Sequence, residues 1–266
     1  MKKVPIIYVA LFAIVIGLMV ITSVNGARSA LIYSDDYISD FEMYHIGITL
    51  QEFGDGETDY KPVGWRNYAP EKEGEDTVEA TWVVNNDIPL FQSINNFVVG
   101  KTYSERFNVV NSGSIDEYVR VKVYKYWLDP KGNKDTTLSP DLIELGLVDD
   151  DNWIIDNDDT PTRTTNERTV LYYSKILKIG ESTPDFMETL KINNGVYDRY
   201  EVSSKSYKEN EKTYTNVVYK YVYDGYTFCV EIEADAVQTH NAVDAIKSSW
   251  GRDVVIDSNG KLSLKN

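Results

Sequence analysis

The sequence predicts an all-β fold, and three observations support this prediction. Apolar and polar side chains alternate along several segments, which is the period of a half-buried β-strand. Turn-forming groups such as Asn111-Ser112-Gly113 and Asp224-Gly225 separate these segments. The chain has 266 residues, of which 42% are hydrophobic and 12% aromatic, enough to bury one sizeable core. We therefore expect a single antiparallel β-sandwich domain with a few short helices.

The N-terminus has the residue order of a secretory leader. Two lysines precede an apolar run of 18 residues, 4–21, and small and polar residues continue to Ala27. This order matches the charged, apolar and cleavage regions of a signal peptide, so we expect residues 1–30 to be removed on export and residues 31–266 to form the mature domain. Cleavage is expected between Ala27 and Ala30. Because 18 apolar residues also approach the length of a membrane span, an uncleaved anchor is the alternative.

Charge and cysteine content limit the possible partners. A formal net charge of −15 would repel nucleic acids and anionic membrane surfaces, so we expect no nucleic-acid partner and membrane contact only through the leader. Cys229 is the single cysteine, so an exported fold would have no intramolecular disulfide. A strand position for Cys229 is favoured over a catalytic nucleophile, because no Cys-His arrangement accompanies it in the sequence.

The first predicted strand lies close to the mature N-terminus. Four apolar residues share one parity there: Tyr44, Ile46, Ile48 and Leu50. His45 has the opposite parity, which favours an exposed strand position over a metal ligand. Residues 53–77 are rich in Gly, Pro and acidic residues, so they predict a long surface excursion before a strand at 80–84.

The clearest alternation surrounds residues 111–113. Downstream, Val119, Val121 and Val123 alternate with polar or amphipathic residues, and upstream Phe107 and Val109 share a parity. Because Asn and Gly tolerate positive φ, we predict that the chain turns back here as a hairpin with one buried face.

A short helix and an acidic segment are predicted next. Ser139 and Pro140 supply an N-cap hydroxyl and a first-turn proline, and Gly146 a stop, so a helix is expected at 140–145. The acidic segment 149–159 lacks the glycine and glutamate that an EF-hand loop needs at its sixth and twelfth positions. A solvated loop is therefore favoured over a calcium site.

The C-terminal half contains a strand and two predicted hairpins. Residues 168–174 are apolar on both parities, which indicates a central strand. Asp224-Gly225 predicts a type I′ turn that joins two facing strands, with Tyr221 opposite Phe228. A terminal hairpin is expected at 254–264.

A helix is predicted between those two hairpins. Asn241 is expected to cap it, the apolar residues Ala242 and Ile246 to give its 3.6-residue period, and Gly251 to end it. His240 precedes the cap, where local packing or capping is favoured over catalysis.

Five short motifs are spread over the mature chain. They are Ala30-Leu31-Ile32-Tyr33-Ser34-Asp35, residues 111–121, Leu171-Tyr172-Tyr173, Ile179-Gly180-Glu181-Ser182-Thr183 and residues 235–242. Together they resemble the TasA/camelysin family of exported Gram-positive proteins. The resemblance implies a jelly-roll β-sandwich with short peripheral helices, secreted into the cell wall or biofilm matrix. Leu31-Ile32-Tyr33 departs from the small-aromatic-aromatic pattern that the family has after its leader.

The resemblance also implies a function. Some members polymerise into fibres when an N-terminal strand is donated to the next subunit. We therefore expect a secreted structural or assembly protein that self-associates into fibres or homo-oligomers and contacts cell-wall or matrix components. Residues 31–50 would be the donated segment, because a terminal strand can leave its own sheet and complete the edge of a neighbour. Pairing of that strand within its own sandwich is the alternative.

Two other functions compete with this expectation. Camelysin is described as a metalloendopeptidase, but zinc proteases usually take two ligands from a His-Glu-x-x-His helix, whereas this chain has only His45 and His240. We therefore predict no protease activity and assign no catalytic, cofactor-binding or metal residue. An adhesin-like binding module is the other alternative, with the acidic segment 149–159 as its surface.

Overall fold

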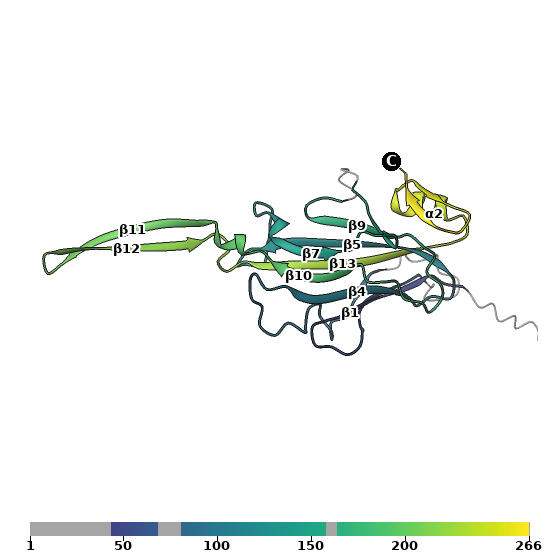
Figure 1. Cartoon of the computed structure of the whole chain (residues 1–266), viewed down its shortest axis with the longest axis horizontal. Helices are drawn as coiled ribbons and strands as arrows, with labels where there is room; N and C mark the ends of the chain where they lie inside the picture. Colours follow the sequence, from purple (N-terminus) through teal and green to yellow (C-terminus); the bar gives the residue numbers. More distant parts are fainter. Residues whose placement is uncertain (1–43, 69–80, 158–163, 266) are drawn as a thin grey trace, which may run out of the picture. The chain divides into compact units, whose positions relative to one another are not determined.

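The computed structural model describes residues 44–68, 81–157 and 164–265, which fold as an antiparallel β-sandwich (Figure 1). This confirms the predicted all-β antiparallel sandwich, because two antiparallel sheets carry the core and the helical segments are short. The predicted leader at residues 1–30 and the arm that follows it to residue 42 lie outside the described residues. Within the described ranges, no helix has both the length and the apolar character that a membrane span requires.

The first sheet has six strands in the order β3-β2-β1-β4-β10-β7. Their bounds are β1 Gly47–Phe53, β2 Lys61–Asn67, β3 Val83–Val84, β4 Tyr103–Asn111, β7 Ile143–Leu147 and β10 Met187–Ile192. β1 lies between β2 and β4, and its residues from Ile48 to Glu52 pair with both neighbours. The strand predicted near the mature N-terminus is thus confirmed, as an interior strand.

The second sheet has the order β13-β5-β9-β8, with β6 paired to β5. Its strands are β5 Glu117–Leu128, β6 Lys134–Asp135, β8 Trp153–Ile155, β9 Arg168–Tyr173 and β13 Thr227–Gln238. β5 and β13 pair along their whole lengths. β9 lies between β5 and β8, which confirms the central position predicted for residues 168–174.

The main core lies between the two sheets, and strand alternation decides which side chains enter it. Val119, Val121 and Val123 of β5 are at most 1% exposed, as their shared parity predicts. Aromatic side chains fill the space between the sheets, where the rings of Trp153 and Phe186 meet edge to face with centroids 5.4 Å apart.

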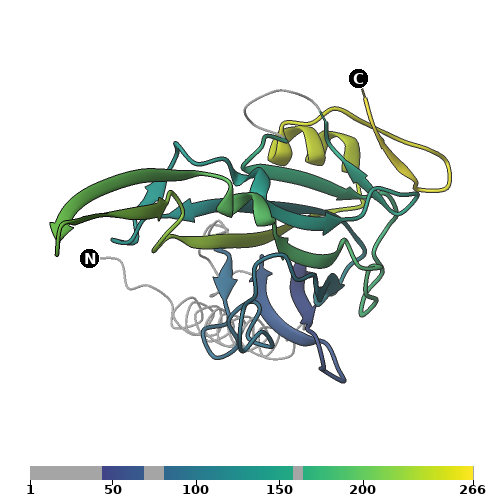
Figure 2. The same ribbon diagram turned by 60° about the vertical axis from the view of Figure 1, so that its left-hand side comes forward.

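A second, smaller core covers the outer face of the second sheet (Figure 2). It is closed by α2 (Ala242–Trp250) and by a hairpin of β14 (Val254–Ile256) and β15 (Leu262–Leu264). Tyr118 and Tyr172 of the sheet pack there with Ile246 and Leu262. The predicted helix and terminal hairpin are both confirmed, and Gly251, with φ 68°, is the C-cap that follows Trp250. The predicted capping by Asn241 is wrong, because Asn241 has a φ of 52° and its side chain makes no capping hydrogen bond.

Asp235 of β13 joins the two sheets. Its carboxylate is 3% exposed and pairs with Arg66 of β2 and Arg120 of β5. Arg120 Nε donates to Asp235 Oδ2 at 3.0 Å, and its guanidinium lies 5.0 Å from the ring centroid of Trp250 in α2. Burial acts to raise the pKa of Asp235, but the charges of Arg120, Lys122 and Arg66 hold it below its ordinary value. This carboxylate therefore ties both sheets and the helix together.

The hairpin predicted around residues 111–113 is wrong, because β4 and β5 belong to different sheets. The intervening residues form a crossing held by Asn111, whose side-chain N–H groups donate to the carbonyls of Ile115 and Leu177 at 2.8 and 3.0 Å. Gly113 passes so close to β1 that a Cβ there would lie 2.6 Å from the Gly47 nitrogen. Residues 111–113 do change the direction of the chain, but they contact the start of β1 and do not form a hairpin with the next strand.

Two other local predictions need correction. The surface excursion predicted at 53–77 contains β2, and residues 69–77 of it lie outside the described residues. The predicted helix at 140–145 is a single 3₁₀ turn, η1 (Pro140–Leu142), whose N-cap Ser139 Oγ accepts from the Asp141 N–H at 3.2 Å. Ile143 then begins β7 with its side chain fully buried, so tertiary packing overrides the helix signal.

Candidate interaction surface

A long two-stranded hairpin projects from one end of the sandwich (Figure 1). It consists of β11 (Tyr200–Glu209) and β12 (Lys212–Tyr221), and all 20 residues of the two strands are exposed. Neither strand pairs with any other strand in the described part of the chain. An isolated hairpin of this kind is only marginally stable in water, because neither face is buried.

The turn of this hairpin corrects the prediction made at Asp224-Gly225. β12 pairs with β11, from Tyr200 opposite Tyr221 to Glu209 opposite Lys212, whereas β13 pairs with β5. Asn210 and Glu211 have φ values of 47° and 62°, and a type I′ turn requires positive φ at both central residues. At the predicted turn only Gly225 has a positive φ, so the chain bends there without forming a hairpin.

The two faces of the hairpin differ in character. One, here called the aromatic face, carries five apolar or aromatic side chains near the base: Tyr200, Val202, Val217, Tyr219 and Tyr221. Its rings contact one another, with centroids 5.3 Å apart for Tyr200 and Tyr219 and 5.8 Å apart for Tyr221 and Tyr197 of η2 (Asn194–Tyr197). The opposite face pairs Glu201 with Lys220 and Glu209 with Lys212, but it also carries Val218 and the stacked rings of Tyr207 and Tyr214. Charged residues therefore concentrate on the opposite face, while both faces expose apolar or aromatic side chains to solvent.

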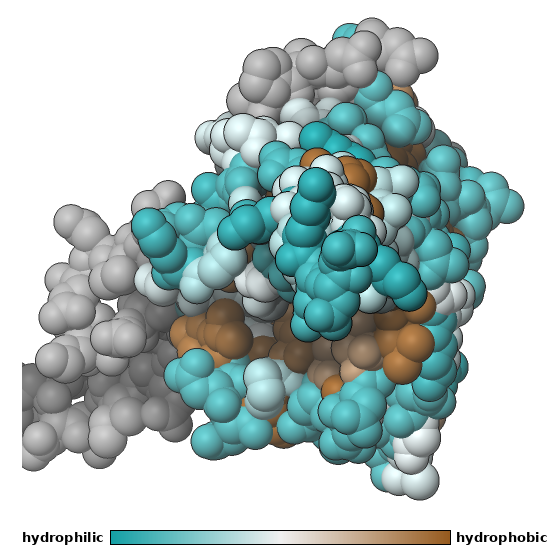
Figure 3. Space-filling model, turned by 90° about the vertical axis from the view of Figure 1, so that its left-hand side faces the viewer, coloured by the Kyte–Doolittle hydropathy of each residue, from teal (hydrophilic) through white to brown (hydrophobic). Residues whose placement is uncertain are grey.

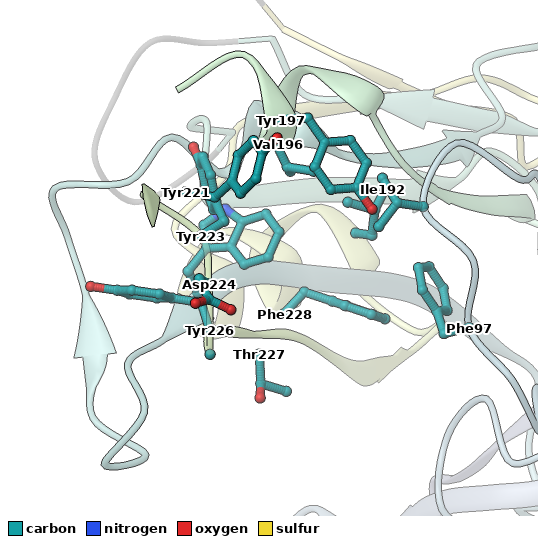
Figure 4. Close-up of a pocket in the computed structure, with 13 residues that line it drawn as sticks. Phe97, Ile192, Val196, Tyr197, Tyr221, Tyr223, Asp224, Tyr226, Thr227 and Phe228 are labelled. Carbon is teal, nitrogen blue, oxygen red and sulfur yellow. The ribbon is translucent and has the colours of Figure 1, made fainter. Parts of the chain in front are cut away.

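An aromatic groove of about 400 Å³ lies at the base of the hairpin (Figure 4). Its walls include Phe97, Trp127, Ile192, Tyr221, Tyr223 and Phe228. Viewed from the end from which the hairpin projects, hydrophobic residues form a hollowed band beside the mostly hydrophilic hairpin (Figure 3). Because Tyr221 belongs to both the groove and the aromatic face, the two form one continuous apolar surface. Such a surface suits an extended segment that pairs through its backbone and inserts apolar side chains.

The structure does not bring the two histidines into a metal site. His45 lies just before β1, and its Nδ1 is 3.3 Å from Ser114 Oγ. His240 is exposed and follows β13. Among the described residues, no three His, Cys, Asp or Glu side chains lie close enough together to hold a metal ion.

Cys229 occupies a strand position in β13, opposite Tyr126 of β5. It is half-buried, and burial raises the pKa of its thiol. A raised pKa keeps the sulfur protonated, which is the opposite of what an activated nucleophile needs.

The acidic segment 149–159 does not form a cluster in its described part, residues 149–157. Asp150 Oδ1 accepts hydrogen bonds from the backbone of Asn152 and Trp153 at 2.7 and 2.8 Å, and these lower its pKa. Asp156 is fully buried and pairs with Arg252, with Nε and Oδ2 3.0 Å apart. The carboxylates of Asp150 and Asp156 thus stabilise a turn and form an internal ion pair.

Sequence analysis missed three buried carboxyl groups. Glu52 of β1 and Glu105 of β4 are 3% and 0% exposed, under a loop in which Phe91 N–H donates to Glu52 and Ser93 Oγ donates to Glu105, both at 2.8 Å. Burial, aided by the Glu105 charge, raises the pKa of Glu52 to about 8, and burial raises that of Glu117 to about 9. Glu52 shares its parity with Ile48 and Leu50, which was the available signal for its burial.

Comparison of the chain with family models, with curated proteins and with solved structures found no match. The resemblance to the TasA/camelysin family therefore remains a prediction from the sequence motifs.

Proposed function

We propose that this chain is a secreted structural or assembly protein of the cell surface or biofilm matrix. The leader pattern supports export. The observation that carries the assembly role is the β11–β12 hairpin, in which every strand residue is exposed and both outer backbone edges are without a partner strand among the residues that the structure describes. Natural proteins usually cover or shorten such edges, because they pair readily with other chains. A long exposed hairpin is what a protein that joins other molecules requires.

The proposal includes strand donation by the N-terminal segment, but by a shorter part of it than residues 31–50. Residues 48–52 hydrogen-bond on both sides within their own sheet, so withdrawing β1 would break two ladders. Donation is therefore assigned to residues 31–42, which precede β1 and lie outside the described residues. Each subunit of a fibre would keep β1 in its own sheet and donate only residues 31–42 to the next subunit.

The two other functions have less support. The zinc endopeptidase would need a third ligand beside His45 and His240, and no metal-binding group of three occurs among the described residues. The adhesin-like module would use segment 149–159, whose described carboxylates are largely engaged within the fold.

The test is to purify the natively exported protein and examine it by electron microscopy and light scattering. The proposal expects the chain in the cell-wall or matrix fraction, without residues 1–30, and in assemblies of several copies. A chain that stays monomeric at matrix-like concentrations would contradict it, and so would zinc-dependent casein cleavage that His45→Ala abolishes.

A further inference from the structure

We propose that two copies of this chain pair through the outer edge of β12, antiparallel and centred on Val217, to form a four-stranded sheet. This inference rests on the assembly function proposed above and names its partner as a second copy. It concerns the hairpin and not the N-terminal segment.

The two edges of the hairpin differ in charge. Residues 213–219 of β12 have the sequence Thr-Tyr-Thr-Asn-Val-Val-Tyr, with no charge, proline or glycine. Such β-prone, uncharged windows favour strand pairing between chains. Over their full lengths, β11 carries four charged residues, Glu201, Lys205, Lys208 and Glu209, whereas β12 carries two, Lys212 and Lys220, which lie outside this window. Charged residues on an edge strand oppose pairing, so β11 is protected and β12 is open.

Backbone geometry identifies the groups that β12 offers. Glu209 and Lys212 close a two-residue turn, so the hydrogen bonds between β11 and β12 fall on even-numbered residues of β12. Odd-numbered residues, among them Thr215, Val217 and Tyr219, therefore direct their N–H and C=O groups to the outer edge. A second strand can bond to them without disturbing the hairpin.

The charge of the hairpin is compatible with a second copy as the partner. The whole chain has a formal charge of −15, which opposes close approach of two copies. Residues 200–221 contain four lysines and three glutamates, which gives this segment a charge of +1. Two hairpins can therefore meet without the repulsion that the rest of the acidic chain would cause.

Cross-strand pairs favour the register centred on Val217 over the register centred on Asn216. With Val217 on the two-fold axis, Tyr219 faces Thr215 of the second copy and Lys220 faces Tyr214, which are favourable aromatic–Thr and cation–π neighbours. Moving the axis to Asn216 would place Lys220 opposite Lys212 of the second copy, and directly opposed like charges are destabilising. The Val217 register avoids this conflict.

The position of the hairpin permits this pairing. It projects from one end of the sandwich (Figure 1), so antiparallel pairing places the two sandwiches at opposite ends of the shared sheet. A two-fold axis perpendicular to that sheet also puts both aromatic faces on the same side. The dimer would therefore present one continuous surface of tyrosine and valine side chains.

Oxidative cross-linking tests the proposal. Val217→Cys and, as a matched control, Ser204→Cys are each made in a Cys229→Ser background, so that each protein has one thiol. Ser204 lies opposite Val217 in the hairpin, on the same face but on the outer edge of β11. Facing hydrogen-bonded residues have Cα atoms about 5.5 Å apart, which a disulfide can span. Val217→Cys should form the covalent dimer at least about ten-fold faster than Ser204→Cys, because only its thiols are held together.

Other results would overturn the proposal. Equal rates for the two variants would indicate stacking of aromatic faces, a faster Ser204→Cys reaction would indicate pairing through β11, and no cross-linking of either would indicate no hairpin contact. As a second experiment, in protein that lacks residues 31–42, Val217→Pro should give monomers and Ser204→Pro should still give dimers, because each removes an outward N–H from one edge only. Fibres that persist at full rate with Val217→Pro would contradict this inference and leave the assembly function standing.

Discussion

Val217 and Ser204 lie directly opposite each other on β12 and β11, yet they occupy edges of different character. Val217 belongs to an uncharged run of seven residues, whereas Ser204 is followed by Lys205 and lies in a strand with four charges. A ribbon with one protected and one open edge can add strands on one side only. This asymmetry limits the size of the assembly that the hairpin can form alone.

Glu211→Gly should stabilise the turn of the β11–β12 hairpin. Glu211 has a φ of 62°, a left-handed conformation that costs a residue with a side chain roughly 1 kcal/mol, and glycine removes that cost. We expect slower hydrogen exchange at the amides of residues 200–221. Glu211→Ala is the control, since alanine keeps the strain. Equal protection in the two variants would show that turn strain does not limit hairpin stability.

Asp235→Asn should destabilise the sandwich strongly. The buried carboxylate neutralises the partly buried Arg66 and Arg120, and its loss would leave both cations without their carboxylate, at a cost of about 3–5 kcal/mol. Urea unfolding measures the change in free energy. Glu233→Gln is the matched control on the same strand, because Glu233 pairs with Lys122 at 2.7 Å in a more exposed position and should cost less than about 1 kcal/mol. Similar losses of unfolding free energy for both variants would show that Asp235 does not hold the two sheets together.

Stability should fall as the pH rises from about 4.5 to about 9. Glu52 and Glu117 have pKa values of about 8 and about 9 in the folded protein, above the ordinary 4.5, so the folded state binds more protons over this range. Their contribution is complete below about pH 4.5 and is lost as the pH passes through the folded pKa values. Melting temperatures measured across this range should therefore decrease.

Replacing the buried carboxyls isolates this effect from the general charge of the protein. Glu52→Gln and Glu117→Gln should each reduce the slope of melting temperature against pH, because the amide cannot ionise. Glu188→Gln, which changes an exposed carboxyl of β10, is the control and should leave the slope nearly unchanged. A slope that is the same in all three variants would show that these carboxyls do not titrate as assigned.

Deleting residues 31–42 should stop assembly at the dimer. A two-fold contact through β12 is closed, so it joins two copies and cannot extend a fibre by itself. Growth then requires a second contact, for which the N-terminal arm is proposed. Electron microscopy and sedimentation of the deleted protein measure the outcome, and fibres of normal length would rule out this role for the arm.

The sequence predicted the core better than the connections. Val119, Val121 and Val123 enter the core as their alternation indicates, because burial depends only on strand period. Strand partners depend on distant residues, and this is where the predictions failed. Asn111 bonds to the Leu177 carbonyl, 66 residues away, and this contact turns a predicted hairpin into a crossing between sheets.

The sequence did not predict the β11–β12 hairpin, for a related reason. Asp224-Gly225 is a stronger type I′ signal than Asn210-Glu211, since glycine adopts positive φ without strain. The pairing of β13 with β5 along their whole lengths outweighs that signal. The available clue was the presence of Tyr and Val residues on both sides of Asn210, with Tyr200, Val202 and Tyr207 before it and Tyr214, Val217, Val218 and Tyr219 after it.

The central claim is that the β11–β12 hairpin joins copies of this chain, and sedimentation velocity of a shortened protein tests it most directly. Glu201 and Lys220 face each other as a hydrogen-bonded pair, so replacing residues 202–219 by Asn-Gly should close the chain without disturbing the sandwich. With residues 31–42 deleted in both proteins, the version with the intact hairpin should pass from monomer to dimer as concentration rises. The shortened version should remain monomeric with an unchanged melting temperature. Equal self-association of the two proteins, or a monomer at every concentration for the intact hairpin, would contradict the account.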